Sequence, residues 1–278
     1  MTGLLALHAH PDDESISMGG TLAEYAAAGV SVTVVTATRG EVGEIYNRDD
    51  ADEIRDRLGE VREEEERAAL SVLGVTDLAY LGYRDSGMMG TDDNERSESF
   101  WRADYMEAVG RLVTIVRDRR PSVMTAYDPF GGYGHPDHIQ VHRVGTAAYF
   151  AAADVGRFPA DEFGEPHLVS KLYWATLARE RMRRVRRALA AEAGEEYVDE
   201  EPTFGTMQEH ISTLRDIRPW AQQKVDALLS HVSQFAADSW IRTLSPDRLG
   251  DVLGDEAFTL IHSTVPCDPS DTDLFAGV

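Results

Sequence analysis

Apolar residues in the first half of the chain follow two alternating patterns. Short apolar or β-branched runs predict buried strands, and longer segments with apolar residues every three or four positions predict amphipathic helices. The predicted strands are residues 4–8, 31–37, 78–81 and 122–127. The predicted helices are residues 21–28, 53–73, 105–119 and 139–153. Strands separated by helices in this way predict a parallel sheet with right-handed crossovers.

The pattern is weaker in the second half. It predicts strands at 170–176 and 211–216, helices at 177–193 and 220–232, loops at 156–166 and 195–206, and a polar-to-apolar tail at 271–278. The expected class is α/β, a Rossmann-like, mostly parallel sheet with helices on both faces and a less regular C-terminal cap. We assign residues 1–155 to the catalytic layer and 156–278 to the cap that completes the cleft, within one integrated domain.

Composition and charge narrow the function classes. A chain of 278 residues with 42% hydrophobic content can form one large domain with a full core. Its net charge of −22 argues against nucleic acid and anionic membranes as partners, because phosphate would be repelled. The single Cys267 excludes internal disulfides, and the N-terminal residues contain neither a basic segment nor a long apolar run. We expect a cytoplasmic protein without a signal peptide or a transmembrane helix.

One tripeptide occurs twice, as His10-Pro11-Asp12 and as His135-Pro136-Asp137. Composition alone predicts about 0.03 copies in a chain of this length. A lone His-Pro-Asp is usually a turn. Both copies, however, follow predicted strands, and parallel sheets bind their ligands at the carboxyl ends of strands. The two segments therefore predict a shared functional site.

The residue types in these segments point to a mononuclear metal centre. We expect His10, Asp13 and His138 to bind one ion per chain. Two imidazoles and one carboxylate suit Zn²⁺, and also Fe²⁺, and leave open positions for water and substrate. The close spacing of His10 and Asp13 fixes two ligands, and the fold would bring the third from a distant loop.

The neighbours of these ligands can supply acid and base. Asp12 is a candidate general base that accepts a proton from metal-activated water. His135, as a cation, could stabilise a tetrahedral oxyanion or protonate a leaving amine. Asp137 could orient His135 through a ring nitrogen. Tyr133 lies in a glycine-rich loop, from which its hydroxyl could reach the substrate carbonyl.

Other conspicuous residues have structural interpretations. His8 shares a strand face with His10 and is expected to be a packed histidine. Residues 63–66, four glutamates, are expected to form a solvated helix face. The arginines of residues 179–187 are expected to pair with nearby acids on the surface, with a phosphate site as the alternative. The Gly19-Gly20 pair lacks the G-x-G-x-x-G spacing, which argues against a nicotinamide cofactor.

The blocks HAHPDDES at 8–15 and GGYGHPDH at 131–138 resemble the LmbE-like (PIG-L) N-acetylglucosaminyl deacetylases. The resemblance extends from Leu4 to the tail. It implies a Rossmann-like fold, bound zinc or iron, and hydrolysis of an amide on a glucosamine. It also implies the roles of the site residues: ligands His10, Asp13 and His138, base Asp12, acid or oxyanion partner His135, orienting carboxylate Asp137 and mobile tyrosine Tyr133.

Within that family the chain is most similar to two mycothiol-pathway activities, a deacetylase of N-acetylglucosaminyl-inositol and the mycothiol S-conjugate amidase. The block RDSGMMGTD and the serine at 17 resemble the deacetylase, whereas VSKLYW at 169–174 and the tail TDLFAGV resemble the amidase. The resemblance implies outer contacts with the sugar and inositol from Ser17, Glu44, Arg62 and Asp85.

Three classes of function follow from the sequence. The first is a metal-dependent amidohydrolase that removes the N-acetyl group from a glucosaminyl substrate. The preferred candidate is N-acetylglucosaminyl-inositol, and the alternatives are a mycothiol S-conjugate, as in the amidase, or another N-acetylglucosamine compound. The second is a non-catalytic sugar-binding relative, which would lack a ligand or the base, and neither is missing. The third is a Rossmann-type transferase or nucleotide-binding protein, which the missing glycine fingerprint disfavours. The expected partner is a small glycosyl amide.

Overall fold

The computed structural model describes residues 2–244, 246–268 and 271–278, and these form a seven-stranded sheet. The strand order is β3-β2-β1-β4-β5-β7-β6. Strands β1 to β5 are parallel, whereas β7 runs antiparallel to both β5 and β6. The strands are β1 (Gly3–His8), β2 (Ser31–Thr38), β3 (Asp77–Tyr83), β4 (Val123–Tyr127), β5 (Lys171–Thr176), β6 (Thr213–Asp216) and β7 (Asp255–Ser263).

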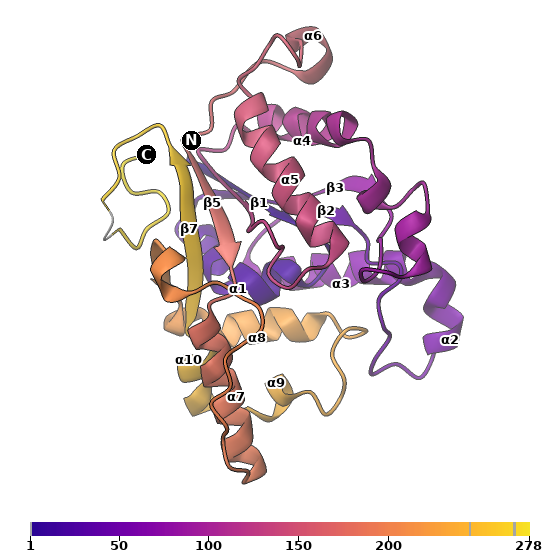
Figure 1. Cartoon of the computed structure of the whole chain (residues 1–278), viewed down its shortest axis with the longest axis vertical. Helices are drawn as coiled ribbons and strands as arrows, with labels where there is room; N and C mark the ends of the chain where they lie inside the picture. Colours follow the sequence, from indigo (N-terminus) through magenta and orange to yellow (C-terminus); the bar gives the residue numbers. More distant parts are fainter. Residues whose placement is uncertain (1, 245, 269–270) are drawn as a thin grey trace.

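Helices cover both faces of this sheet, as the α/β class requires (Figure 1). Helices α4 and α5 pack on one face, and α1, α3 and α8 pack on the other. The longer helices are α1 (Asp13–Ala27), α3 (Leu58–Leu73), α4 (Tyr105–Arg119), α5 (Pro136–Ala151), α7 (Arg179–Ala193) and α8 (Ala221–Ser230). The shorter helices are α2 (Ala51–Ile54), α6 (Ala160–Phe163), α9 (Trp240–Thr243) and α10 (Pro246–Leu253). The expected fold class is confirmed.

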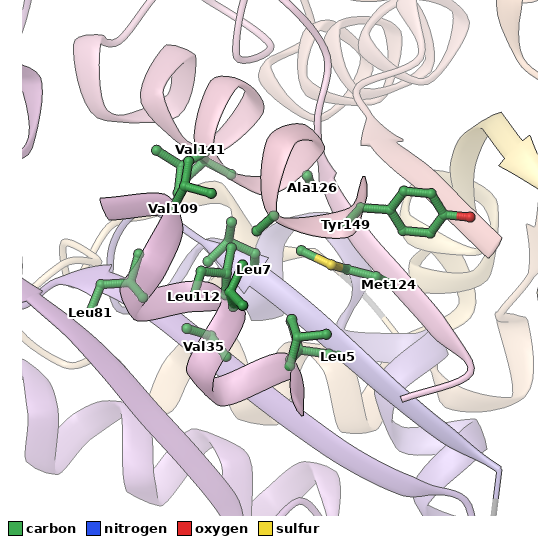
Figure 2. Close-up of a cluster of buried hydrophobic side chains, with 14 of the residues drawn as sticks. Leu5, Leu7, Val35, Leu81, Val109, Leu112, Met124, Ala126, Val141 and Tyr149 are labelled. Carbon is green, nitrogen blue, oxygen red and sulfur yellow. The ribbon is translucent and has the colours of Figure 1, made fainter. Parts of the chain in front are cut away.

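The alternation of side chains along β1 divides the core into two layers. Leu5 and Leu7 pack with Leu112 of α4 on one face (Figure 2), whereas Leu4 and Ala6 pack against α1 and α3 on the other. All these side chains are buried, and burying a leucine contributes about 2 kcal/mol. A register slip of one residue would exchange the two layers, so the packing fixes where β1 ends.

The strand order creates a switch point between β1 and β4. The chain leaves β1 toward β2 on one side and later continues from β4 to β5 on the other side. Crossovers that diverge in this way leave a crevice at the carboxyl ends of the two strands. Residues 9–12 after β1 and residues 128–135 after β4 meet there. The first loop contains the whole first His-Pro-Asp segment, and the second loop ends with His135, where the second segment begins.

Helix α1 begins eight residues before the predicted start at residue 21. It is kinked at Met18, where φ is −147° and ψ is 24°. The kink frees the backbone N–H groups of Gly20 and Thr21, which donate to the Glu256 carboxylate at 2.9 and 2.8 Å. Gly20 is needed for close approach, because a Cβ there would lie 2.7 Å from the Ile217 side chain. The sequence pattern predicts only the part of the helix after the kink.

Strand β7 is absent from the sequence prediction. Its first residues, Asp255 and Glu256, are acidic, which disguises the strand pattern that follows. Glu256 is fully buried and accepts a hydrogen bond from the buried Lys224 ammonium at 2.5 Å, so the charge pair replaces apolar packing at this position. Residues 156–278 supply β5, β6 and β7 to the same sheet as the N-terminal strands. The division of the chain at residue 155 stays a prediction.

The expected solvated face at residues 63–66 is wrong for its second half. Glu65 and Glu66 are buried. Glu65 accepts hydrogen bonds from the backbone N–H and the hydroxyl of Ser233 at 2.8 and 2.7 Å. Glu66 accepts hydrogen bonds from the hydroxyls of Thr36, at 2.5 Å, and Tyr80. Helix α3 therefore directs a polar stripe toward the interior beneath the crevice.

Glu66→Gln should reduce the pH dependence of stability. Burial, and then the charge of Glu14, raise the pKa of Glu66 to about 8, whereas the unfolded value is 4.5. Between these values the folded state keeps a proton that the unfolded state has lost, so stability falls as pH rises. Glutamine, like the protonated carboxyl group, can accept from one hydroxyl and donate to the other, but it does not ionise. From pH 5.5 to 8 we expect Glu66 to account for a loss on the order of 3 kcal/mol.

The measurement is the unfolding free energy from urea titrations of both proteins at pH 5.5 and 8. The other charged groups that act on Glu66, including the buried His231, are common to both proteins and cancel in the difference. Equal pH dependence in the two proteins would contradict the buried, protonated state of Glu66.

Candidate metal centre and active site

A cavity of about 370 Å³ opens at the carboxyl ends of β1 and β4. Its wall includes every predicted site residue except Asp137 and Glu44. Asp137 is fully buried directly behind the wall, where it hydrogen-bonds to His10. Glu44 is exposed on the loop after β2, so the structure does not bring it into the cavity. The wall residues predicted from the sequence are His10, Asp12, Asp13, Ser17, Arg62, Asp85, Tyr133, His135 and His138.

The two His-Pro-Asp segments precede helices, but they are not structurally equivalent. Asp12 is the residue before α1, so the first tripeptide lies wholly outside its helix. His135 is the residue before α5, and Pro136 is already in the first turn, where its fixed φ suits the helix. The Nδ1 atom of His135 accepts the Asp137 backbone N–H at 3.2 Å and caps α5. As a result, His138 lies in the first turn of α5 and faces the segment after β1.

The three predicted ligand atoms form a compact triangle. His10 Nδ1 lies 3.5 Å from Asp13 Oδ2, His138 Nε2 lies 3.3 Å from the same oxygen, and the two nitrogens are 3.4 Å apart. Ligands about 2.1 Å from one tetrahedral ion are about 3.4 Å from each other. All three residues are buried. The donor set and its spacing therefore fit a single divalent ion.

The second nitrogen of each histidine is also held. His138 Nδ1 hydrogen-bonds to the Gly131 carbonyl at 3.1 Å. His10 Nε2 lies 3.2 Å from Asp137 Oδ2 and 3.5 Å from Asp85 Oδ1. Metal-binding histidines usually carry such a carboxylate or carbonyl partner, which fixes the ring and its proton. The rings are oriented before any ion binds.

Asp137 thus holds a different histidine from the one predicted. Its carboxylate hydrogen-bonds to His10 rather than to His135, and it also accepts the backbone N–H of Ser86 at 2.9 Å and the Ser86 hydroxyl. The reason is local geometry, because Asp137 and His135 are joined through the helix cap and their side chains diverge. Ser86 was not identified from the sequence, although it lies in the block that resembles the deacetylases.

The described residues offer two further groups that could hold a metal ion. Ligand atoms of His10, Asp85, His135 and Asp137 lie within 4.8 Å of one another, as do those of His10, His135 and His138. The carboxylates of the first group already accept hydrogen bonds, Asp85 from the Gly87 N–H at 2.8 Å and Asp137 from Ser86. All three sides of the triangle around Asp13 measure 3.3 to 3.5 Å, which is the spacing that one tetrahedral ion requires, and we therefore develop it as the candidate.

Asp12 has an unusual backbone conformation beside this triangle. Its φ is 110° and its ψ is −29°, a region that costs a non-glycine residue about 1–3 kcal/mol. Its backbone N–H donates to Glu14 Oε2 at 2.9 Å, and its carboxylate accepts from Arg62 Nη2 at 3.2 Å. Burial raises the pKa of Asp12 to about 6, although Arg62 acts in the opposite direction. Such a carboxylate is suited to accept a proton near neutral pH.

A buried ion pair supports Asp12 from below. His231, after α8, lies 2.9 Å from Glu14 Oε1, and both side chains are fully buried. Burial lowers the pKa of His231, but the charge and hydrogen bond of Glu14, together with the charges of Asp12 and Glu66, raise it overall. Sequence reasoning missed both residues. Glu14 could have been found because it adjoins the first motif, whereas His231 lies near the end of the predicted helix 220–232, where nothing in the surrounding sequence marks it as functional.

The guanidinium group of Arg62 forms its hydrogen bonds within the protein. It donates to the Pro11 carbonyl at 2.5 Å, to the Gly40 carbonyl at 3.0 Å and to Asp12. The inositol contact implied by the resemblance would predict a higher KM alone for Arg62→Ala. The observed bonds predict instead that kcat falls about tenfold or more, because Asp12 loses its charge partner and the loops at Pro11 and Gly40 lose the side chain that joins them. Steady-state kinetics would decide, and a change confined to KM would restore the substrate-contact role.

His135 is neutral rather than the expected cation. Burial, and then the neighbouring His10 and His138, lower its pKa to about 3. Because Nδ1 accepts a backbone N–H, the ring proton is on Nε2. The ring of Tyr133 meets that of His138 edge-on at 4.9 Å, and 42% of Tyr133 is exposed. His135 and Tyr133 can therefore both donate a hydrogen bond at the cavity wall.

The outer residues differ in what they can contribute. Ser17 lines the cavity, but its hydroxyl donates to the Asp13 carbonyl at 2.6 Å and so stabilises the start of α1. Asp85 lines the cavity, and its Oδ1 atom lies 3.5 Å from His10 Nε2. Ile16 and Met88 add apolar wall that sequence reasoning did not identify. Among the described residues, no helix is both long and apolar enough to cross a membrane.

Known proteins resemble this chain both in sequence and in fold. The PIG-L family, described as GlcNAc-PI de-N-acetylase, matches residues 5–149. A protein of Streptomyces avermitilis named 1D-myo-inositol 2-acetamido-2-deoxy-alpha-D-glucopyranoside deacetylase is 43% identical, over 99% of this chain and 97% of its own. A protein of the same name from Acidothermus cellulolyticus is 45% identical, over 99% and 94%. The N,N'-diacetylchitobiose deacetylase of Pyrococcus horikoshii shares the fold with a TM-score of 0.65 and 21% identity, over 94% of this chain and 84% of its own.

Proposed function

The chain belongs to the PIG-L family of GlcNAc-PI de-N-acetylases, and we propose that it removes the N-acetyl group from N-acetylglucosaminyl-inositol. The observation that carries the proposal is the triangle of His10, Asp13 and His138 with Asp12 beside it, in the cavity wall. The relatives that match nearly the whole chain carry the name of this deacetylase. The reaction is hydrolysis of an amide, which gives acetate and a glucosaminyl amine.

We propose Zn²⁺ as the bound ion, held by His10, Asp13 and His138, with Fe²⁺ suited to the same donors. When bound, a divalent ion at this place supplies Lewis acidity, which activates water and polarises the amide carbonyl. Asp137 and the Gly131 carbonyl support the ligands by fixing the two imidazole rings.

The protein's own groups complete the chemistry. Asp12 accepts a proton from the attacking water as its oxygen bonds to the amide carbon. The Nε2–H of His135 and the hydroxyl of Tyr133 donate to the carbonyl oxygen as negative charge develops on it. Asp12 then passes the proton to the amide nitrogen as the carbon–nitrogen bond breaks. The base ends as it began, and acetic acid and the amine leave, which become acetate and the glucosaminyl ammonium once the acid gives its proton to the amine.

The mycothiol S-conjugate amidase is the alternative within the family, because it would use the same bond chemistry. Ser17 is short, uncharged and bonded to the Asp13 carbonyl, so it offers a bulky acyl-cysteine portion no charged contact. The test is a panel of N-acetylglucosaminyl-inositol, free N-acetylglucosamine and a mycothiol S-conjugate, with amine release measured on metal-loaded enzyme. We expect the highest kcat/KM for N-acetylglucosaminyl-inositol.

Two results would contradict this proposal in different ways. A tenfold preference for the conjugate, about 1.4 kcal/mol in transition-state binding, would assign the chain to the amidase. No turnover of any of the three compounds by protein with full metal content would indicate a sugar-binding relative without catalysis. His138→Ala serves as the background control in every assay.

A further inference from the structure

Three arginines of the cluster at residues 179–187 pair with acids, as the sequence predicts, and Arg181 is an exception of particular interest. Arg179 and Arg183 contact Glu201, and Arg184 contacts Asp255. These three pairs are partly exposed and belong to the surface. They leave no free cation among themselves that could bind a ligand.

Arg181, the exception, points the other way. It is only 9% exposed, and it lines the active-site cavity. Thr176, the last residue of β5, and Leu177, which follows it, line the same part of the wall. Within the described parts of the chain, no residue forms a hydrogen bond or an ion pair with its guanidinium group. The hydroxyl of Thr176 is also buried without a hydrogen-bond partner. This end of the cavity therefore contains donors that the protein itself leaves unsatisfied.

The charges of Glu256 and Asp255 act on Arg181, but neither carboxylate lies within ion-pair distance of its guanidinium group, and each has a partner of its own. Glu256 is bonded to Lys224, and Asp255 is bonded to Arg184. Burial lowers the pKa of Arg181, which reflects the cost of holding the charge there, but a guanidinium remains protonated at any physiological pH. A buried cation with five N–H donors is stabilised when an acceptor, above all an anionic one, enters the cavity.

We propose that Arg181 and the first turn of α7 form an oxyanion subsite within the active-site cavity, for a carboxylate or a phosphate group. The N-terminal end of α7 adds its positive dipole, and its first residues have no side-chain cap. The inference rests on the proposed function, because the ligand shares the cavity with the scissile amide. The oxyanion has two sources, the carboxylate product of amide hydrolysis or a phosphate group carried by the glycosyl substrate.

The test measures binding by calorimetry on the metal-loaded full chain, with acetate, inorganic phosphate and neutral myo-inositol as probes. The variants are Arg181→Met, which removes the charge at similar size, and Arg181→Lys, which keeps the charge but loses the planar fork. Arg186→Met is the matched control, because Arg186 is exposed on the same helix and does not line the cavity. Metal content and thermal midpoint are measured for every protein, so that anion binding to the ion stays constant.

We expect Arg181→Met to weaken acetate or phosphate binding at least tenfold, Arg181→Lys to be intermediate, and Arg186→Met to stay within twofold of the parent. A loss confined to phosphate would identify a phosphorylated substrate, and a loss confined to acetate would identify the product carboxylate. Unchanged binding of both anions by Arg181→Met, or equal losses in Arg186→Met, would overturn the subsite. So would a loss confined to myo-inositol, which would make Arg181 a hydroxyl donor.

The outcome is separable from that of the proposed function. Anion binding that depends on Arg181 in a protein that deacetylates none of the panel substrates would keep the subsite and reject the activity. Deacetylation with anion binding unaffected by Arg181 would do the reverse. If Arg181→Met fails to fold, Arg181→Lys carries the test, because a fork-dependent oxyanion site must still lose affinity.

Discussion

His138→Ala is expected to lose its metal and its activity together. The ligand triangle has only three protein donors, so removal of one imidazole leaves a histidine and an aspartate, which hold a divalent ion poorly. The lost side chain also opens space next to Tyr127 and Tyr133, whose rings contact it. We expect metal content well below one tenth of the parent value and deacetylation at background.

The measurement is elemental analysis after gel filtration, with amine release on the same samples. His142→Ala is the matched control, because His142 lies one turn later on α5, where Nδ1 bonds to the Tyr127 carbonyl at 3.0 Å outside the cavity wall. It should retain one ion and measurable turnover. Full metal occupancy in folded His138→Ala protein would reject the assignment and would favour the alternative group around Asp85 and Asp137.

The sequence predicts the metal triangle because its signal is local and chemically specific. Two His-Pro-Asp segments at strand ends need only a parallel sheet to bring them together, and the periodicity of the first half predicts that sheet. The switch point between β1 and β4 then places His10 and His138 face to face. Nothing about this juxtaposition depends on the details of the C-terminal half.

The polar groups beneath the site could not be predicted in the same way. Glu14 and His231 meet across 217 positions of sequence, and Glu65 reaches Ser233 across 168. A run of glutamates on a helix is usually solvated, and only tertiary packing against residues 231–234 buries part of it. Arg181 could not be distinguished either, because only tertiary packing buries it, while its neighbours Arg179, Arg183 and Arg184 form the expected surface pairs.

The fold shows a related limit at its C-terminal end. Strand β7 begins with two acidic residues, and its charge is balanced by Lys224 and Arg184 from other elements. Periodicity describes one segment at a time, so it cannot distinguish an acidic loop from a strand whose acids have buried partners. The kink at Met18 is similar, because Glu256 of β7 satisfies the N–H groups that it exposes.

Asp12→Asn tests the base, and its expected effect is a loss of turnover of order 10²-fold or more with the metal retained. Asparagine has the size of aspartate and tolerates positive φ well, so the strained backbone at this position is preserved. The N–H bond to Glu14 does not involve the side chain, and the amide oxygen can still accept from Arg62. What disappears is the carboxylate that can take a proton from water.

Because that interaction is made in the transition state, kcat and kcat/KM should fall together while KM changes little. Asp49→Asn, an exposed carboxylate on the loop after β2, is the control for amide substitution and should match the parent enzyme. Near-normal turnover in metal-replete Asp12→Asn would move the proton transfer to another group. With Asp13 proposed as a metal ligand and Asp137 bonded to Ser86, Asp85 would then be the carboxylate in the cavity wall to test next.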